Sequence, residues 1–238
     1  MGQTEKELIN ELARLANEER AMASMRFFKT GPGQYGEGDK FIGVLQPDIR
    51  GVCKKFKTLP INELNKLVEN PVHEHRMAAL IIVAEQFKKA DSNKQTQLYG
   101  FYLAALARGK INNWDLIDVT CPHVMGQYLK NKPKDILYEL VKSRSLWERR
   151  ASVLATFAFI QNGESEDAIK ICKLLMNDKE DLIHKATGWM LREVGKRIDE
   201  RILTDFLDQH SQEMPRTMLR YSIEKLTINQ KQKYMSLK

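Results

Sequence analysis

His73-Glu74-His75-Arg76 is the first of five short segments that can be laid over one another along this chain. The other four are Asn112-Asn113-Trp114-Asp115, Trp147-Glu148-Arg149-Arg150, Leu182-Ile183-His184-Lys185 and Thr217-Met218-Leu219-Arg220. The fourth residues of consecutive segments are separated by 39, 35, 35 and 35 residues, a spacing typical of stacked helical-pair repeats. The sequence therefore predicts an all-α solenoid of antiparallel helix pairs, with a curved shape and a long concave face.

The length and composition of the chain fit one repeat array. A chain of 238 residues with 42% hydrophobic residues can bury a sizeable core, and a stacked array forms one continuous domain. We expect that domain to cover residues 1–228. Residues 229–238 are polar, and we expect them to form a frayed tail.

The charge of the chain indicates an acidic partner. The formal net charge is +7 and the isoelectric point is near 9.2, which is where nucleic acid becomes a reasonable partner. The alternative is a soluble protein that is merely rich in lysine. If the concave face carries the excess charge, it is suited to bind an acidic polymer.

The cysteines and the apolar segments favour a cytoplasmic protein. Cys53, Cys121 and Cys172 are far apart and odd in number, so they form no disulfide framework and no CxxC metal site. The first 17 residues lack the apolar segment of a signal peptide. The apolar run from Met77 to Ala84 is too short to cross a bilayer, so we expect no membrane partner.

The chain is expected to be helical almost throughout. Thr4 and Glu7 form a capping-box pattern, which predicts a helix that runs through Phe27-Phe28 and ends at Gly31-Pro32. Asn113 is expected to cap a short helix that is interrupted near Pro122. Further helices are expected from Pro47 to Lys57, from Pro60 through Val68, from Pro71 to Lys89, and over Gln95–Arg108, Lys134–Ser143, Leu146–Gln161, Ser165–Met176, Lys179–Arg197, Arg201–His210 and Pro215–Leu226.

Several patterns that resemble chemical sites have simpler explanations. Gly31-Pro-Gly33-Gln-Tyr-Gly36 satisfies GxGxxG, but it follows a helix rather than a strand, so a loop is favoured over a dinucleotide site. His73 and His75 are two residues apart and point in different directions on a helix, and the other histidines are isolated. No serine or cysteine lies in a nucleophile motif. We therefore expect no metal and no cofactor.

Four residues whose side chains could take part in catalysis or binding lie near the repeat register. Relative to the fourth residues of their segments, Trp114, Asp118, Arg150 and Trp189 lie at −1, +3, 0 and +4. These offsets cover roughly 140° of a helix surface, so stacked units would bring one carboxylate, one arginine and two indoles to one face. The alternative is that both tryptophans are core anchors between helices. That alternative leaves the matched aspartate and arginine unexplained.

At these residues the chain resembles the AlkD-type DNA glycosylases, which are HEAT-like repeat proteins that excise alkylated bases. The resemblance is carried by Asn113-Trp114-Asp115-Leu-Ile-Asp118, Trp147-Glu-Arg-Arg150 and Lys185-Ala-Thr-Gly188-Trp189-Met-Leu-Arg192-Glu193. It extends from about Ala23 to Leu226, and the motifs occur in the family's order and spacing. Together they are quite specific, whereas each alone would be weak.

The resemblance implies a role for each matching residue. Asp118 would be the catalytic carboxylate, Trp114 and Trp189 would line the space beside the damaged nucleotide, and Arg150 would hold the DNA backbone. The family's aromatic residue near the end of the first helix corresponds to Phe27. Candidates for phosphate contacts are Arg149, Lys185, Arg192, Lys196, Arg216 and Arg220.

We accordingly expect a monomer that acts on duplex DNA with N3- or N7-alkylated purines and, in a bacterium, associates with the nucleoid. The family's usual tyrosine is Phe27 here, and the loop from Thr30 to Lys40 is longer and richer in glycine. A second hypothesis is therefore a DNA-binding paralogue with little excision activity, which recognises distorted or branched DNA. A third, a protein-interaction scaffold, leaves the four register residues unexplained.

Overall fold

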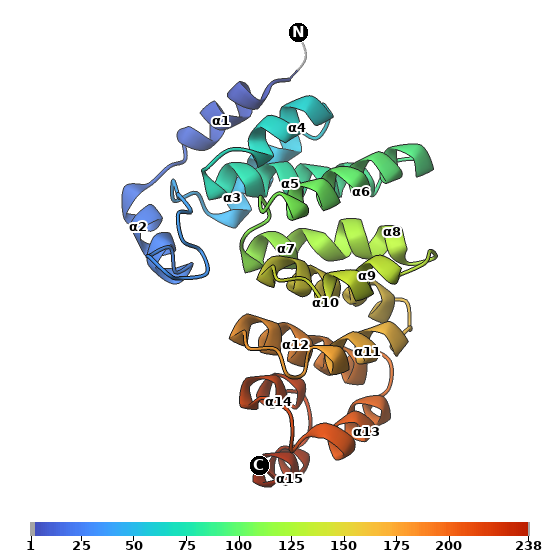
Figure 1. The fold of residues 1–238 in the computed structure, drawn as a ribbon. Helices are drawn as coiled ribbons and strands as arrows, with labels where there is room; N and C mark the ends of the chain where they lie inside the picture. Colours follow the sequence, from blue (N-terminus) through green and yellow to red (C-terminus); the bar gives the residue numbers. More distant parts are fainter. Residues whose placement is uncertain (1–2, 238) are drawn as a thin grey trace. The chain divides into compact units, whose positions relative to one another are not determined.

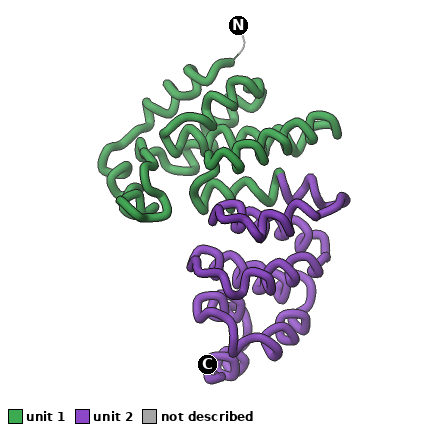
Figure 2. The backbone as a smooth tube through the Cα atoms, in the orientation of Figure 1, with its two compact units in different colours: residues 1–124 green, residues 125–238 purple. Residues whose placement is uncertain are grey.

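The computed structural model describes residues 3–237 and is helical throughout. Over these residues the only β-type pairing is one isolated parallel bridge between Lys40 and Val72. The predicted all-α class is confirmed, and the helix pairs are compatible with HEAT-like repeats. The chain divides into two compact units, residues 1–124 (unit 1) and residues 125–238 (unit 2), which Figure 2 shows in different colours.

Unit 1 is organised around one buried helix. Its helices are α1 (Glu5–Ala13), α2 (Glu18–Phe27), α3 (Gln46–Lys55), α4 (Ile61–Val68), α5 (His73–Phe87), α6 (Ser92–Ala107) and α7 (Trp114–Cys121) (Figure 1). The central helix α5 packs against α3, α4, α6 and α7, and nearly all of its residues are buried. A helix that is apolar on all sides has to lie inside the protein, and Met77–Ala84 is that apolar run.

Unit 2 stacks its helices in succession. Its helices are α8 (Gln127–Leu129), α9 (Asp135–Leu140), α10 (Leu146–Ile160), α11 (Glu166–Leu174), α12 (Asp181–Arg197), α13 (Glu200–His210), α14 (Arg216–Ser222) and α15 (Ile228–Ser236). Helix α12 packs against α10 on one side and α14 on the other (Figure 1). Gly188 permits the second contact, because a Cβ there would lie 2.4 Å from the carbonyl oxygen of Met218.

Most helix boundaries agree with the sequence predictions, but the N-terminal helix is two helices. Asn17 ends the first segment and caps α2, with its side chain accepting a hydrogen bond of 2.8 Å from the backbone N–H of Arg20. Its own N–H donates to the carbonyl of Ile42 at 2.9 Å, which is a long-range contact that local periodicity does not reveal. Asn113 caps α7 as predicted, and a π-helical turn, Pro122–Gly126, interrupts the helix at the predicted proline.

The observed helix starts correct the repeat register. Counting from the first helical residue, Asp118 of α7, Arg150 of α10 and Lys185 of α12 are each fifth, whereas Asp115 is second. Trp114 is first and Trp189 is ninth. Positions one, five and nine of an α-helix cover about 80° of its surface, so the match is closer than the predicted alignment gave. The first two segments were misaligned because the distance along the chain from the start of α5 to the start of α7 differs from the distance from the start of α7 to the start of α10.

The fourth helical position has a structural role in three helices. Arg76 of α5 and Arg149 of α10 each donate from Nη1 to the carbonyl oxygens six and five residues earlier, all at 3.0 Å. His184 of α12 contacts the carbonyl oxygen of Asp178, also six residues earlier, at 2.6 Å from Nε2. These contacts satisfy backbone groups in the turn that precedes each helix. They explain why side chains with nitrogen donors recur at the fourth helical position.

The predicted frayed tail is wrong for the residues that the structure describes. Thr227 and Gln230 form a capping box that begins α15. The ring of Tyr234 is buried, and its hydroxyl donates to Oδ1 of Asp208 at 2.9 Å. Burial of one large aromatic side chain outweighs the polar character of the segment around it.

One continuous domain over residues 1–228 stays a prediction, as do the curvature and the basic concave face. Over residues 3–237, none of the helices is both long enough and apolar enough to span a membrane.

Candidate active site

The start of α7 presents an indole and a carboxylate on one side of the helix. The side chain of Asn113 accepts a hydrogen bond of 2.9 Å from the N–H of Trp114 and so fixes the first turn. Trp114 and Asp118 are four residues apart, which places them one turn from each other on the same face. Both are partly exposed, while the intervening Leu116 and Ile117 are buried. Unit 1 therefore brings together two of the predicted site residues.

The groups behind Asp118 are neutral and buried. The hydroxyl oxygen of Tyr102, in α6, lies 3.0 Å from the hydroxyl oxygen of Thr120, with which it forms a hydrogen bond. Cys121 is fully buried. Burial raises the pKa of both Tyr102 and Cys121, and the negative charge of Asp118 raises both further. Neither group supplies an anion at neutral pH, so Asp118 is the ionisable group available at this point of the helix surface.

Two phenylalanine rings contact the indole of Trp114, and a third continues the aromatic cluster to His73. Phe28 stacks on Trp114 with centroids 5.3 Å apart and an interplanar angle of 25°, and Phe27 meets Trp114 edge-on at 5.9 Å. Phe28 also stacks on Phe41 at 5.0 Å, and Phe41 stacks on the imidazole of His73 at 4.5 Å. Phe27 is 65% exposed although it is large and apolar. The cluster thus ends in an aromatic surface open to solvent.

His73 is the buried link between two carboxylates that are far apart in sequence. Its Nδ1 lies 3.1 Å from Oδ2 of Asp39, and its Nε2 lies 2.8 Å from Oδ2 of Asp115. Two carboxylate partners require both ring nitrogens to carry hydrogen. Burial disfavours the imidazolium, but the hydrogen bonds to Asp115 and Asp39 outweigh it and raise the pKa of His73 to about 9. The residue is therefore a cation at neutral pH.

Asp39 is shared by His73 and a second cation. Nη2 of Arg76 donates to Oδ1 of Asp39 at 2.5 Å, and Asn112 donates to the same oxygen at 3.0 Å. Burial by itself raises the pKa of Asp39, but the hydrogen bond from His73 and the charge of Arg76 lower it to about 2. Asp39 and Arg76 are both nearly inaccessible to solvent. A buried network of this kind is stable only because every charge has a partner.

The glycine-rich loop is fixed at its C-terminal end by the start of α5. The buried carboxylate of Glu74 accepts hydrogen bonds from the backbone N–H groups of Ile42, Gly43 and Val44 at 2.8 to 3.3 Å. The N–H of His73 donates to the carbonyl of Lys40 at 2.8 Å. The loop follows a helix, α2, and no strand precedes it within the described chain. The loop instead carries Phe41 and Asp39 to the aromatic and ionic clusters.

The two neighbouring histidines differ as the helix geometry predicts. His75 points away from the carboxylates that bind His73, and neither of its ring nitrogens has a hydrogen-bond partner. Burial, followed by the charge of Arg76, lowers the pKa of His75 to about 4. His75 is thus a neutral core residue. Over residues 3–237, no three or more His, Cys, Asp or Glu side chains are grouped to hold a metal ion.

Unit 2 holds the other two predicted site residues. Arg150 is 4% exposed, and its Nη1 donates to the carbonyl oxygen of Leu182 at the start of α12. Trp189 is partly buried, lies 6.1 Å from the ring of Phe157, and donates from Nε1 to Oε1 of Glu193 at 3.2 Å. Arg150 is thus held rigidly at the α10–α12 contact. That these two residues share one site with Trp114 and Asp118 stays a prediction.

The six candidates for phosphate contacts fall into two groups. Arg149, Lys185 and Arg192 form ion pairs within unit 2, with Asp178 at 2.6 Å, Asp181 at 2.8 Å and Glu193 at 3.0 Å respectively. Arg216 is exposed and donates to the carbonyl of Met235 at 3.3 Å. Lys196 and Arg220 are exposed and form no salt bridge within residues 3–237. The exposed group is better suited to meet an external anion.

The ionic cluster was not predicted, because His73 was considered only together with His75 as a possible chelating pair. The partners of His73 are 34 residues before it and 42 residues after it, and no local spacing connects them. Asp115 was considered only as part of a repeat segment and of the family motif. Phe28 and Phe41 carried no signal beyond their apolar character. The aromatic pair Phe27-Phe28 at the end of α2 was the one local sign of this surface.

Comparisons with known proteins agree with this fold. A family model described as DNA alkylation repair enzyme matches residues 8–226. Among solved structures, the chain is similar to a predicted DNA alkylation repair enzyme from Enterococcus faecalis, with a TM-score of 0.69 and 15% sequence identity over 90% of this chain and 97% of that one. At this identity the likeness shows the fold alone. The search of curated proteins gave no match.

Proposed function

We propose a function for this chain, which belongs to the DNA alkylation repair enzyme family. It hydrolyses the N-glycosidic bond of cationic alkylated purines in duplex DNA. The observation that carries the proposal is the pairing of Trp114 and Asp118 on one partly exposed face of α7, next to the open aromatic surface of Phe27. A carboxylate beside exposed rings suits a substrate that is both aromatic and positively charged.

The aromatic surface supports binding of the lesion. Alkylation at N3 or N7 makes a purine cationic, and a cation over an aromatic face gains about 0.5 to 2 kcal/mol, depending on desolvation. Trp114 is supported from behind by the stacked ring of Phe28, while Phe27 meets its edge and is exposed. The rings therefore keep their positions without a ligand, which reduces the entropy lost on binding.

The carboxylate of Asp118 supplies the chemistry. As the glycosidic bond breaks, its electrons pass to the cationic base, which leaves as a neutral purine, and positive charge develops on the sugar. A fixed carboxylate stabilises that charge and positions the attacking water, whose proton is released as the new C–O bond forms. Tyr102 and Cys121 behind Asp118 stay neutral, so they do not compete for this role.

The His73 network positions this surface. His73 joins Asp39, in the loop after α2, to Asp115, in the first turn of α7. Asp115 lies next to Trp114, and Asp39 precedes Phe41 by two residues. The buried ion pairs thus hold the two segments that carry the aromatic rings in one arrangement, which preorganises the site.

In the same proposal, unit 2 contributes contacts to the DNA. Trp189 occupies position nine of α12, on the same helical face as Trp114 and Asp118 in α7. Arg150, at position five of α10, is nearly buried and would act by holding the start of α12 in place. Lys196 and Arg220 are exposed cations without salt bridges in the described chain, and we assign them to phosphate contacts. Binding would then weaken steeply with salt.

The runner-up is a DNA-binding paralogue with little excision activity, which recognises distorted or branched DNA. It is favoured by the glycine-rich loop, which lies next to the aromatic surface: the hydroxyl of Tyr35 contacts the carbonyl of Phe27 at 3.4 Å. A loop at this place can restrict how a nucleotide approaches Trp114. The two functions share the binding surface and differ in the use of Asp118.

The deciding experiment is release of base from duplex DNA that contains N7-methylguanine or N3-methyladenine. Asp118→Asn should lower the rate by at least about a hundredfold, the scale of losing one electrostatic contact to the transition state, while DNA affinity is retained. The matched control is Asp135→Asn, at an exposed aspartate of α9 with no salt bridge within residues 3–237; it should act like wild type. Wild-type protein that binds DNA and releases no base would select the runner-up.

A further inference from the structure

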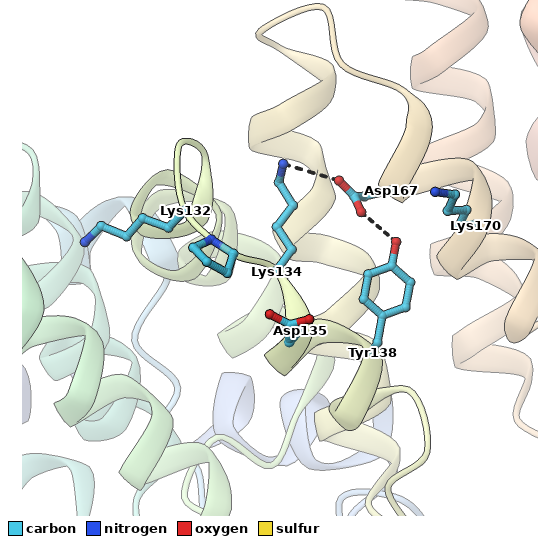
Figure 3. Close-up of a pocket in the computed structure, with 7 residues that line it drawn as sticks. Lys132, Lys134, Asp135, Tyr138, Asp167 and Lys170 are labelled. Atoms are coloured by element: carbon cyan, nitrogen blue, oxygen red, sulfur yellow. Dashed lines mark hydrogen bonds and ion pairs between the residues drawn. The ribbon is translucent and has the colours of Figure 1, made fainter.

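One cavity in unit 2 and one in unit 1 have cations that are paired with carboxylates. In unit 2, a cavity of about 480 Å³ is lined by Lys132, Lys134 and Lys170 (Figure 3). Figure 3 shows Lys134 directed toward Asp167, at 3.3 Å, and Lys170 pairs with Glu166 at 2.6 Å. In unit 1, a cavity of about 240 Å³ beside Arg76 has its cations paired with Asp39 and Glu69. Neither cavity has an unbalanced set of cations.

A third cavity, in unit 1, is larger and strongly cationic. It has a volume of about 870 Å³ and lies among the C-terminal ends of α3 and α5 and the first residues of α4 and α6. Glu85, on its edge, is 12 residues beyond His73, or about 18 Å along the axis of α5. The cavity is therefore separate from the candidate active site.

The floor of this cavity is apolar and fixed in place. Cys53, Leu59 and Ile81 line it and are buried. The side-chain amide of Gln86 donates to the carbonyl oxygens of Leu59 at 2.8 Å and Lys57 at 3.1 Å, which ties the end of α5 to the turn between α3 and α4. Burial raises the pKa of the Cys53 thiol to about 12, so the thiol adds no charge to the floor. The floor thus suits an apolar group.

The rim carries five cations and one carboxylate. The cations are Arg50, Lys54, Lys57, Lys89 and Lys94. The carboxylate is Glu85, which already pairs with Lys88 at 2.6 Å. Among the described residues, none of the five forms a salt bridge. Clustered cations without counter-charges repel one another, so an anion at the rim would relieve this repulsion.

We propose that this cavity binds a small amphipathic anion, with an apolar body against Leu59 and Ile81 and a carboxylate or phosphate head among the rim lysines. The volume is within the usual range for small-molecule sites, and the combination of an apolar floor with a few convergent charges is typical of them. The charge of the rim selects the sign of the head group. The proposal does not depend on glycosylase activity, because no residue of the active site lines the cavity.

The test is calorimetric titration of the full chain with octyl phosphate, octanoate and octanol. We expect saturable binding of at least one of the two anions, and binding of octanol at least about tenfold weaker. Comparison of the phosphate with the carboxylate identifies the preferred head group. Equal binding of octanol, or no saturable binding of either anion at millimolar concentration, would overturn the proposal.

Variants separate the roles of the floor and the rim. Ala90→Trp, in the turn after α5, should fill the cavity and abolish binding without disturbing the core. Lys54→Glu/Lys57→Glu should weaken binding of the anion at least about tenfold. The matched control, Lys173→Glu/Lys179→Glu in unit 2, makes the same change in net charge and should have no effect. Thermal unfolding verifies that each variant is folded.

Competition by DNA gives a further check. Duplex DNA should not displace the bound anion, because the site is a cavity for a small molecule. Displacement by DNA, or unchanged binding of the anion by the Ala90→Trp variant, would show that the cations belong to an open surface for nucleic acid and would contradict the proposal.

Discussion

Arg76 in unit 1 and Arg149 in unit 2 have the same local geometry and different surroundings. Each is the fourth residue of its helix and donates to the carbonyl oxygens six and five residues earlier. Arg149 then pairs with one carboxylate, that of Asp178, at 2.6 Å. Arg76 pairs with Asp39, which also binds the imidazolium of His73.

The difference shows how a repeated structural device can acquire a second role. In unit 2, Arg149 joins the start of α10 to the turn that precedes α12. In unit 1 the same arrangement, with His73 and Asn112 added, also holds the loop that carries Phe41 against His73. The helix start is common to both units, whereas the connection to an aromatic surface occurs around Arg76.

The largest effect on stability is expected from a substitution at Asp39, which is compared with the same substitution at Asp178. Asp39→Asn leaves the buried guanidinium of Arg76 without its counter-charge and the buried imidazolium of His73 with that of Asp115 alone, so it should lower the free energy of unfolding by about 3 to 5 kcal/mol. Asp178→Asn should cost about 1.5 to 3 kcal/mol, because Arg149 keeps its two carbonyl acceptors and is 15% exposed. Urea denaturation measures both. Equal losses would contradict the distinct role of unit 1.

The second prediction concerns pH. Because the folded state binds the proton of His73 more tightly than the unfolded chain does, this stabilisation is complete below about pH 6.5 and is lost as the pH rises through about 9. The shift corresponds to at most about 3 kcal/mol. His73→Gln should remove that decline in urea midpoints measured from pH 6 to 10.

The control for the pH experiment is His184→Gln, at a histidine that contacts a backbone carbonyl instead of two carboxylates. It should keep the wild-type dependence on pH. A decline between pH 6.5 and 9 that persists in His73→Gln would mean that another group causes it.

The smallest effect is expected at one exposed cation. If Lys196 contacts a phosphate, Lys196→Gln should weaken DNA binding a few-fold at all sequences and reduce the slope of log affinity against log salt by about one. Lys173→Gln, at an exposed lysine of α11 in the same unit, is the matched control and should leave the slope unchanged. Equal slopes for both variants would remove Lys196 from the proposed interface.

Local signals in the sequence predicted much of the fold. Asn113 was recognised as a cap and Pro122 as an interruption, because both act on the backbone within a few residues. The break at Asn17 and the folded end at Tyr234 were missed, since they depend on contacts with Ile42 and Asp208. The repeat register was approximate for the same reason: the lengths of the connections depend on packing.

The sequence by itself determined an all-helical repeat chain, the face of α7 shared by Trp114 and Asp118, and the family resemblance. These follow from periodicity and motif spacing, which are properties of the chain alone. Only the tertiary structure decided that His73 is a buried cation between Asp39 and Asp115. The same holds for the packing of Phe27 and Phe28 on Trp114 and of Phe41 on Phe28 and His73. The protonation of a side chain depends on burial and on charges brought near it by folding, and these cannot be derived from residue order.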